Sequence, residues 1–223
     1  MKIFLLLSSV LSALATFASA ERVVRSIYYQ GSDDAPRKAF LYGVSGKHVE
    51  VNFPRSNISD AVELPDGGEI FSLLPAILPE DGAIPKNAPQ VGIPKDWKLS
   101  ALLISKDEGN PVLPVRATPV NMSDSVFRPG EMLWINLTDI MVGGKIGDTK
   151  LLLKPKGTEL LKAPKSERGD YPVVIDCLIP GDKETRWLVR QTWRHTPRAR
   201  QLVFVQPLEP PRIATLHSVS FYE

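Results

Sequence analysis

The densest group of chemically capable side chains lies within residues 185–200, where five arginines and two tryptophans fall in sixteen positions. Our candidate ligand-binding residues are Arg186, Arg190, Arg194, Arg198, Trp187 and Trp193. Guanidinium groups bind carboxylate, sulfate or phosphate through paired hydrogen bonds, and indole rings stack on sugar rings. This chemistry favours an anionic glycan as the ligand of the segment.

A strand over residues 186–195 would divide these side chains between two faces. Arg186, Leu188, Arg190, Thr192 and Arg194 would share one face, and Trp187, Val189, Gln191, Trp193 and His195 the other. The commoner arrangement of such a strand has its tryptophans in the core and its arginines paired with acids across the sheet. A helix is the other possibility, because apolar residues recur at helical spacing, and it would remove the two faces.

Acidic side chains offer a second kind of chemistry. Pairs occur at Asp33-Asp34, Glu80-Asp81 and Asp107-Glu108, and two carboxylates that meet in a cleft form the acid and base of a glycosidase. Their turn-like settings favour solvated loop tips instead. The chain contains no G-x-S-x-G or H-E-x-x-H motif. We therefore expect a protein that is not an enzyme, with a glycan hydrolase as the alternative.

Neither the glycine-rich run nor the cysteine and histidine residues match the pattern of a cofactor or metal site. Residues 143–149 are similar to a phosphate-binding loop, but Ile146 follows the lysine where serine or threonine is needed, which favours a hairpin or a bulge. Cys177 is the only cysteine, and apolar neighbours predict a buried, inert thiol. His48, His195 and His217 lie far apart in the sequence. We expect neither a metal nor a cofactor.

The spacing of prolines and glycines along the chain predicts β-structure. Twenty prolines and fifteen glycines separate about fourteen short runs rich in Val, Ile, Leu, Tyr and Trp, and no segment sustains a helical stripe. We expect an all-β protein with two Ig-like antiparallel β-sandwiches, over residues 21–119 and 120–223. One continuous large sandwich is the alternative. Residues 75–94, with five prolines, should form an extended surface segment.

Residues 133–138 show the clearest alternation. Leu133, Ile135 and Leu137 should share one face of a strand, with Trp134, Asn136 and Thr138 on the opposite face. Trp134 and Asn136 then either line a groove or belong to a solvent face with cross-strand hydrogen bonds.

The first twenty residues have the features of a secretory leader. Lys2 precedes an apolar run that is too short to span a bilayer, and Ala18-Ser19-Ala20 suits signal peptidase. Cleavage before Glu21 leaves 203 residues whose net charge falls from +2 to +1. We expect a secreted or periplasmic product without a membrane span, and its charge argues against a nucleic-acid partner.

The second half carries a resemblance. Residues 127–130 lead into residues 134–137, then residues 143–147, Thr192-Trp193, Arg200 and Phe204. Over residues 125–207 this pattern resembles small secreted β-rich bacterial proteins that are uncharacterised, which implies a bacterial protein outside the cytoplasm and no particular mechanism. Together these features predict a secreted, non-enzymatic binding or scaffolding protein of the cell envelope. Its partner would be an envelope protein or an anionic glycan, and its oligomeric state is left open.

Overall fold

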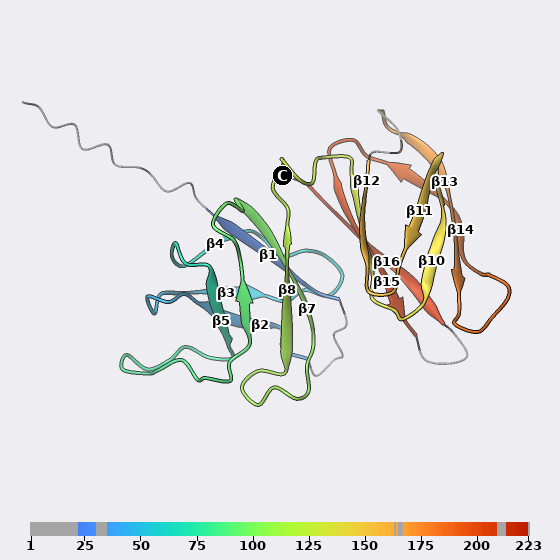
Figure 1. Ribbon diagram of the computed structural model, residues 1–223. Coiled ribbons are helices and arrows are strands. Elements are labelled where there is room, and N and C mark those ends of the chain that lie inside the picture. The colour runs from blue at the N-terminus through green and yellow to red at the C-terminus, as the bar shows by residue number, and fades with distance from the viewer. Residues whose placement is uncertain (1–21, 30–34, 163, 165–166, 209–212, 223) are drawn as a thin grey trace, which may run out of the picture.

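The chain folds as β-structure throughout the part that the structure describes. The computed structural model describes residues 22–29, 35–162, 164, 167–208 and 213–222, which contain sixteen strands in four four-stranded sheets and no α-helix (Figure 1). The predicted all-β class is therefore confirmed. Among these residues there is no helix of the length and hydropathy that crossing a membrane requires. The predicted leader, residues 1–20, lies outside the described residues.

The first eight strands form two sheets, and we call residues 22–121 the N-terminal half. The strands are β1 (Val23–Tyr28), β2 (Lys38–Tyr42), β3 (His48–Asn52), β4 (Val62–Glu63), β5 (Ile70–Leu74), β6 (Gln90–Gly92), β7 (Leu99–Lys106) and β8 (Val115–Asn121). One sheet has the order β4-β1-β7-β8 and the other β3-β2-β5-β6. All strand pairs are antiparallel except β1 and β7, which are parallel.

The last eight strands repeat this arrangement, and we call residues 132–222 the C-terminal half. The strands are β9 (Met132–Asn136), β10 (Met141–Ile146), β11 (Thr149–Leu153), β12 (Thr158–Leu161), β13 (Gly169–Leu178), β14 (Arg186–His195), β15 (Arg200–Pro207) and β16 (Ala214–Phe221). Their sheets are β12-β9-β15-β16 and β11-β10-β13-β14, which is the first order with eight added to every strand number. The single parallel pair also recurs, between β9 and β15.

Each half is a β-sandwich with its own core. In the N-terminal half Val24 and Leu102 of one sheet pack with Leu41 and Phe71 of the other, and an equivalent cluster fills the C-terminal half. The strand order differs from that of an immunoglobulin constant domain, in which the second and third strands lie in different sheets. Here β2 and β3 are hydrogen-bonded neighbours. The structure therefore supports two sandwiches but not the Ig-like part of the prediction.

The central strands of the two inner sheets are buried on both faces. The face of β1 and β7 that points away from its own core packs against the equivalent face of β9 and β15, which gives four stacked sheets (Figure 1). Leu103, Ile135 and Phe204 belong to this third core, and Tyr29 stacks on Phe204 with ring centroids 5.5 Å apart. Burial on both faces explains the unbroken apolar runs of β7 and β15.

The connection between the halves is bound to both of them. The predicted boundary at residues 119 and 120 falls inside β8, whose pairing with β7 continues to Asn121. In the connection, Ser123 Oγ accepts a bond from the Lys98 N–H, while Asp124 pairs with buried Arg200 of β15. Arg200 Nε also donates to the Phe127 carbonyl at 2.6 Å. These contacts bond the connection to both halves.

Two segments differ from the expected strands. Residues 75–94 form a loop whose end is the strand β6, paired with β5. The glycine-rich run forms a hairpin, one of its two predicted forms, in which Ile146 pairs with Thr149 across a two-residue turn. Its first arm is the strand β10, where a side chain at Gly144 would collide with the Val174 carbonyl of the neighbouring strand.

Candidate functional site

The arginine-rich segment is a strand at the edge of a sheet. In the part of the chain that the structure describes, β14 pairs with β13 alone, and each of three arginines meets an aspartate. Arg190 lies 2.9 Å from Asp176, Arg186 lies 2.8 Å from Asp182, and Arg194 lies 3.7 Å from Asp170. Arg198 is exposed in the turn that follows. The acids offset much of the positive charge that would attract an anionic glycan.

A β-bulge changes the two faces that the alternation predicted. The pairing with β13 shifts between Ile175 and Asp176, so that Leu188 is the extra residue of β14. Leu188 therefore packs against the core, whereas Trp187 pairs with Asp176 and is 72% exposed on the arginine face. Trp193 stacks at 5.9 Å on buried Trp134, as the core interpretation predicted. Trp187 and Trp193 thus lie in different environments rather than on one aromatic face.

The other predicted chemical groups lie apart from one another. Glu80 and Asp81 are exposed on a loop, Asp107 pairs with Arg116, and Glu108 pairs with Lys106. Asp33 and Asp34 lie outside the described residues.

The cysteine and the histidines also have packing partners. Cys177 is buried in the C-terminal core, and burial raises the pKa of its thiol, with a smaller opposing effect of Arg186. His48 stacks on Tyr42, and His217 stacks on Phe204. His195 is buried, and burial lowers its pKa. Within the described ranges no three histidine, cysteine, aspartate or glutamate side chains come together as a metal site would require.

A groove between the two halves is the most promising binding feature. This binding groove has a volume of about 490 Å³ and is lined mainly by apolar side chains from both halves. Its N-terminal wall includes Leu103, Thr118 and Val120, and its C-terminal wall includes Leu133, Ile135, Leu137 and Leu160. Trp97 and Val126 also line it. Concave, mostly apolar sites of several hundred Å³ at junctions between domains are where proteins commonly bind ligands.

One wall contributes a phenol. Tyr29 lines the binding groove, and its backbone carbonyl accepts a bond from Gln206 Nε2 at 2.6 Å across the junction. Burial raises the pKa of the Tyr29 phenol, although its hydrogen bond with Ser105 and the charge of Arg116 oppose the shift. The phenol is therefore neutral at physiological pH, and it is a polar group that both donates and accepts hydrogen bonds.

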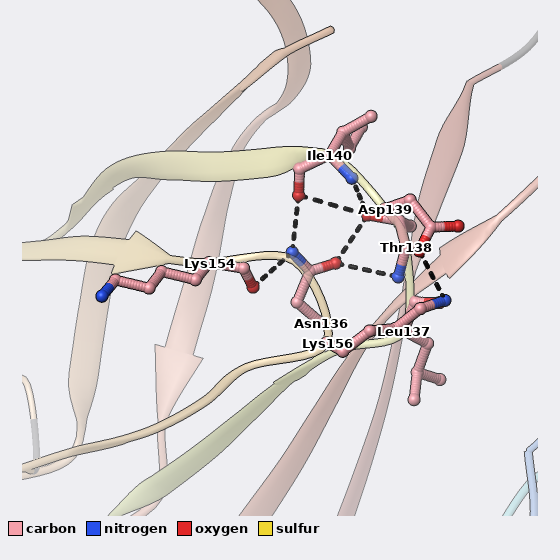
Figure 2. Close-up of polar contacts among 7 residues, drawn as sticks. All are labelled: Asn136, Leu137, Thr138, Asp139, Ile140, Lys154 and Lys156. Atoms are coloured by element: carbon pink, nitrogen blue, oxygen red, sulfur yellow. Dashed lines mark hydrogen bonds and ion pairs between the residues drawn. The ribbon is translucent and has the colours of Figure 1, made fainter. Parts of the chain in front are cut away.

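The opposite wall is held by a polar corner, defined here as residues 136–140 with residues 154–157 (Figure 2). Asn136 is 1% exposed, and its Nδ2 donates to the Ile140 carbonyl at 2.8 Å and to the Lys154 carbonyl at 3.0 Å. Asn136 Oδ1 accepts bonds from the N–H and the hydroxyl of Thr138, at 3.0 Å and 2.6 Å. The Asn136 amide is thus fully used inside the protein.

Lys156 completes the corner at the edge of the groove. Its Nζ donates to the Leu137 carbonyl at 2.7 Å and lies 3.3 Å from Asp139 (Figure 2). Its φ of 56° is the only positive value among the described residues other than glycine, which follows from the tight turn before β12. The polar corner therefore fixes the backbone of Leu137 and of Lys156, both of which line the groove.

The alternation in residues 133–138 is present as predicted, and Asn136 is among the residues that line the groove, whereas Trp134 packs in the C-terminal core. Leu133, Ile135 and Leu137 face the groove and the core between the halves, while Trp134 is fully buried in the C-terminal core. The groove itself could not be foreseen, because its lining residues are up to 131 positions apart in the sequence, from Tyr29 to Leu160. One sequence feature does hint at the junction between the halves: the unbroken apolar run in residues 101–104, which indicates a strand buried on both faces.

A second cavity, of about 740 Å³, lies beside the connection between the halves. It is lined by charged side chains of both signs, including Arg25, Lys98, Asp96 and Asp124. Asp124 is engaged by the buried Arg200, and Arg25 donates to the Ser59 carbonyl at 3.0 Å. These contacts give Asp124 and Arg25 structural roles, so we do not assign a reaction to this cavity.

Comparison with known proteins does not assign the chain to a family. A scan against protein-family models finds no match, and a search of curated protein sequences finds none either.

Proposed function

We propose that the protein is an exported, non-enzymatic binding protein of the cell envelope that holds an apolar part of its ligand in the binding groove. The observation that carries the proposal is the groove itself: an apolar concavity of about 490 Å³ whose walls come from both halves. Its polar groups are few, and those of the polar corner are satisfied within the protein. The leader-like residues 1–20 support export.

The chemistry of the groove favours an envelope protein over an anionic glycan as the ligand. Sugars and sulfates need hydrogen-bond donors that are free to reach them, whereas burial of apolar side chains gains about 25 cal/mol per Å². Three of the four arginines that suited a glycan lie on β14, where Asp170, Asp176 and Asp182 pair with them. Apolar side chains of a partner protein therefore suit the groove best.

A small apolar dye tests the groove. We expect 1-anilinonaphthalene-8-sulfonate to bind the wild-type protein and to fluoresce, and we expect Leu160→Arg to reduce that binding at least fivefold. Leu160 lines the groove and is 39% exposed, so the substitution need not disturb a core. Leu152→Arg on the neighbouring strand is the control, because Leu152 is 64% exposed outside the groove.

Near-ultraviolet circular dichroism establishes that both variants remain folded. Equal dye binding by the Leu160→Arg variant and the wild type would contradict the proposal. An equal loss in the Leu152→Arg control would also contradict it, since the dye would then be responding to exposed leucines in general.

A further inference from the structure

The cavity of about 740 Å³ beside the connection is reached by one arginine of β1. Side chains alternate along a strand, so Arg25 points to the same face as Ile27 and Tyr29, which pack in the core between the halves. Arg25 is half-buried and lines the cavity. Its guanidinium is therefore partly removed from water, on a face of β1 that is otherwise apolar.

Arg25 makes few bonds inside the protein. Its Nη1 donates to the Ser59 carbonyl at 3.0 Å, and its Nε is buried with no hydrogen-bond partner. Among the residues that the structure describes, no carboxylate lies within ion-pair distance of its guanidinium. Arg200, by contrast, is buried with both Asp124 and the Phe127 carbonyl as acceptors. A partly desolvated charge without a counter-ion is unfavourable, so the position of Arg25 favours the binding of an anion.

A second cation lines the same cavity. Lys98 immediately precedes β7, and its backbone N–H donates to Ser123 Oγ at 3.2 Å, which fixes it beside the connection. Its ammonium group has no acid partner within the described ranges. Ser123 also lines the cavity, and because its oxygen is the acceptor of that bond, its O–H can donate to a ligand. Two cations and a hydroxyl group are thus brought together around one space.

The acids of this cavity do not cancel both cations. Asp124 is engaged by Arg200, whose charge offsets it. Asp96 is exposed and has no ion-pair partner in the part of the chain that the structure describes. The remaining charged side chains of the lining, Arg25, Lys98 and Asp96, therefore leave an excess of one positive charge. This balance favours an anion over a cation as the ligand.

We propose that this cavity binds a small organic anion through a carboxylate or phosphate group held by Arg25 and Lys98. Hydrogen bonds from a guanidinium or an ammonium group to such an oxyanion are charge-assisted and are among the strongest that side chains make. The apolar part of the ligand packs on the rest of the wall, to which Val23, Ala61 and Leu99 contribute. The cavity has the volume of small-molecule sites and shares no lining residue with the binding groove.

Isothermal titration calorimetry with phenyl phosphate and with benzoate tests the proposal, and benzyl alcohol is the uncharged control probe. We expect one molecule of either anion to bind the wild-type protein, and the tighter of the two identifies the anionic group. Arg25→Gln should weaken binding about tenfold or more, because it removes a charged donor. Asp96→Asn should strengthen binding about twofold or more, because it removes an acid that repels the anion. Lys95→Gln, at an exposed lysine outside the cavity, is the matched control and should bind as the wild type does.

Failure of both anions to bind would overturn the proposal, as would equal binding by the Arg25→Gln variant or an equal loss in the Lys95→Gln control. Benzyl alcohol that binds as tightly as benzoate would also overturn it, because the charge would then play no part. If Arg25→Gln prevents folding, the exposed Asp96→Asn variant decides, and unchanged binding there contradicts the proposal. Phenyl phosphate should not displace 1-anilinonaphthalene-8-sulfonate from the binding groove, so this proposal and the proposed function fail separately.

Discussion

Replacing Asn136 with alanine should destabilise the protein by about 3 kcal/mol. The substitution removes the four hydrogen bonds of the buried amide in the polar corner (Figure 2). At about 1 kcal/mol net for each bond the loss is about 4 kcal/mol. The carbonyls of Lys154 and Ile140 keep a bond or contact from Gly157 and Thr138, which brings the expected loss to about 3 kcal/mol.

Thermal unfolding followed by circular dichroism measures this loss. For a protein of this size 1 kcal/mol shifts Tm by about 2–4 °C, so Asn136→Ala should lower Tm by about 6–12 °C. Asn57→Ala, at an exposed asparagine, is the control and should change stability by less than about 0.5 kcal/mol. A loss below about 1 kcal/mol at Asn136 would refute the view that its amide holds the groove wall.

Asn136→Asp tests the Nδ2 donor alone, because aspartate has nearly the shape of asparagine but no amide N–H. The ionised carboxylate would place an oxygen against the carbonyls of Ile140 and Lys154, where the amide now donates. On protonation the carboxyl group regains one donor. The aspartate variant should therefore recover part of its lost stability, relative to the wild type, between pH 7 and pH 4, while the alanine variant should not. Equal pH dependence of the two variants would contradict this assignment of donors.

Three further predictions concern the C-terminal half. Cys177, buried with a raised pKa, should react with a thiol reagent at pH 8 only after denaturation, and rapid labelling of the native protein would contradict this. Burial raises the pKa of the Tyr171 phenol to about 12, compared with about 10 in the unfolded chain. The free energy of unfolding should therefore fall by about 2–3 kcal/mol as the pH rises from 10 to 12, because the unfolded chain ionises first. Tyr171→Phe should lack this alkaline decline in Tm, and an identical profile would show that the phenol does not titrate there. Removing the partners of Arg190 and Arg194 by Asp176→Asn with Asp170→Asn should strengthen retention on heparin resin, and unchanged retention would contradict their role as neutralising partners.

Local patterns predicted the strands well because side-chain alternation is a local property. Residues 132–136 and 186–195 are strands in segments where alternation suggested them. Many prolines and glycines separate elements as anticipated, although Pro119 and Pro172 lie inside β8 and β13. β6 was missed because its three residues lie in the proline-rich segment. β10 was expected only as part of a hairpin or a bulge, because two of its six residues are glycines. Glycine in a strand interior gives no side-chain pattern from which to predict pairing.

Other features depend on contacts that no local pattern encodes. The bulge at Leu188 moves Trp187 onto the arginine face, and nothing in the neighbouring residues marks that shift of register. Burial of both faces of β7 and β15 requires the two sandwiches to stack through their central sheets. The binding groove results from that stacking. The candidate residues on β14 were therefore chosen for their chemistry, whereas the groove is a property of the folded chain.

The most direct test of the proposed function is the indole N–H spectrum of the four tryptophans during titration with 1-anilinonaphthalene-8-sulfonate. Trp97 lines the binding groove, Trp187 is exposed on β14, and Trp134 and Trp193 stack on each other in the C-terminal half. A groove between the halves that binds the dye predicts that the Trp97 resonance moves and that the other three keep their positions. Movement of the Trp187 resonance with Trp97 unchanged would place binding on β14 and contradict the account.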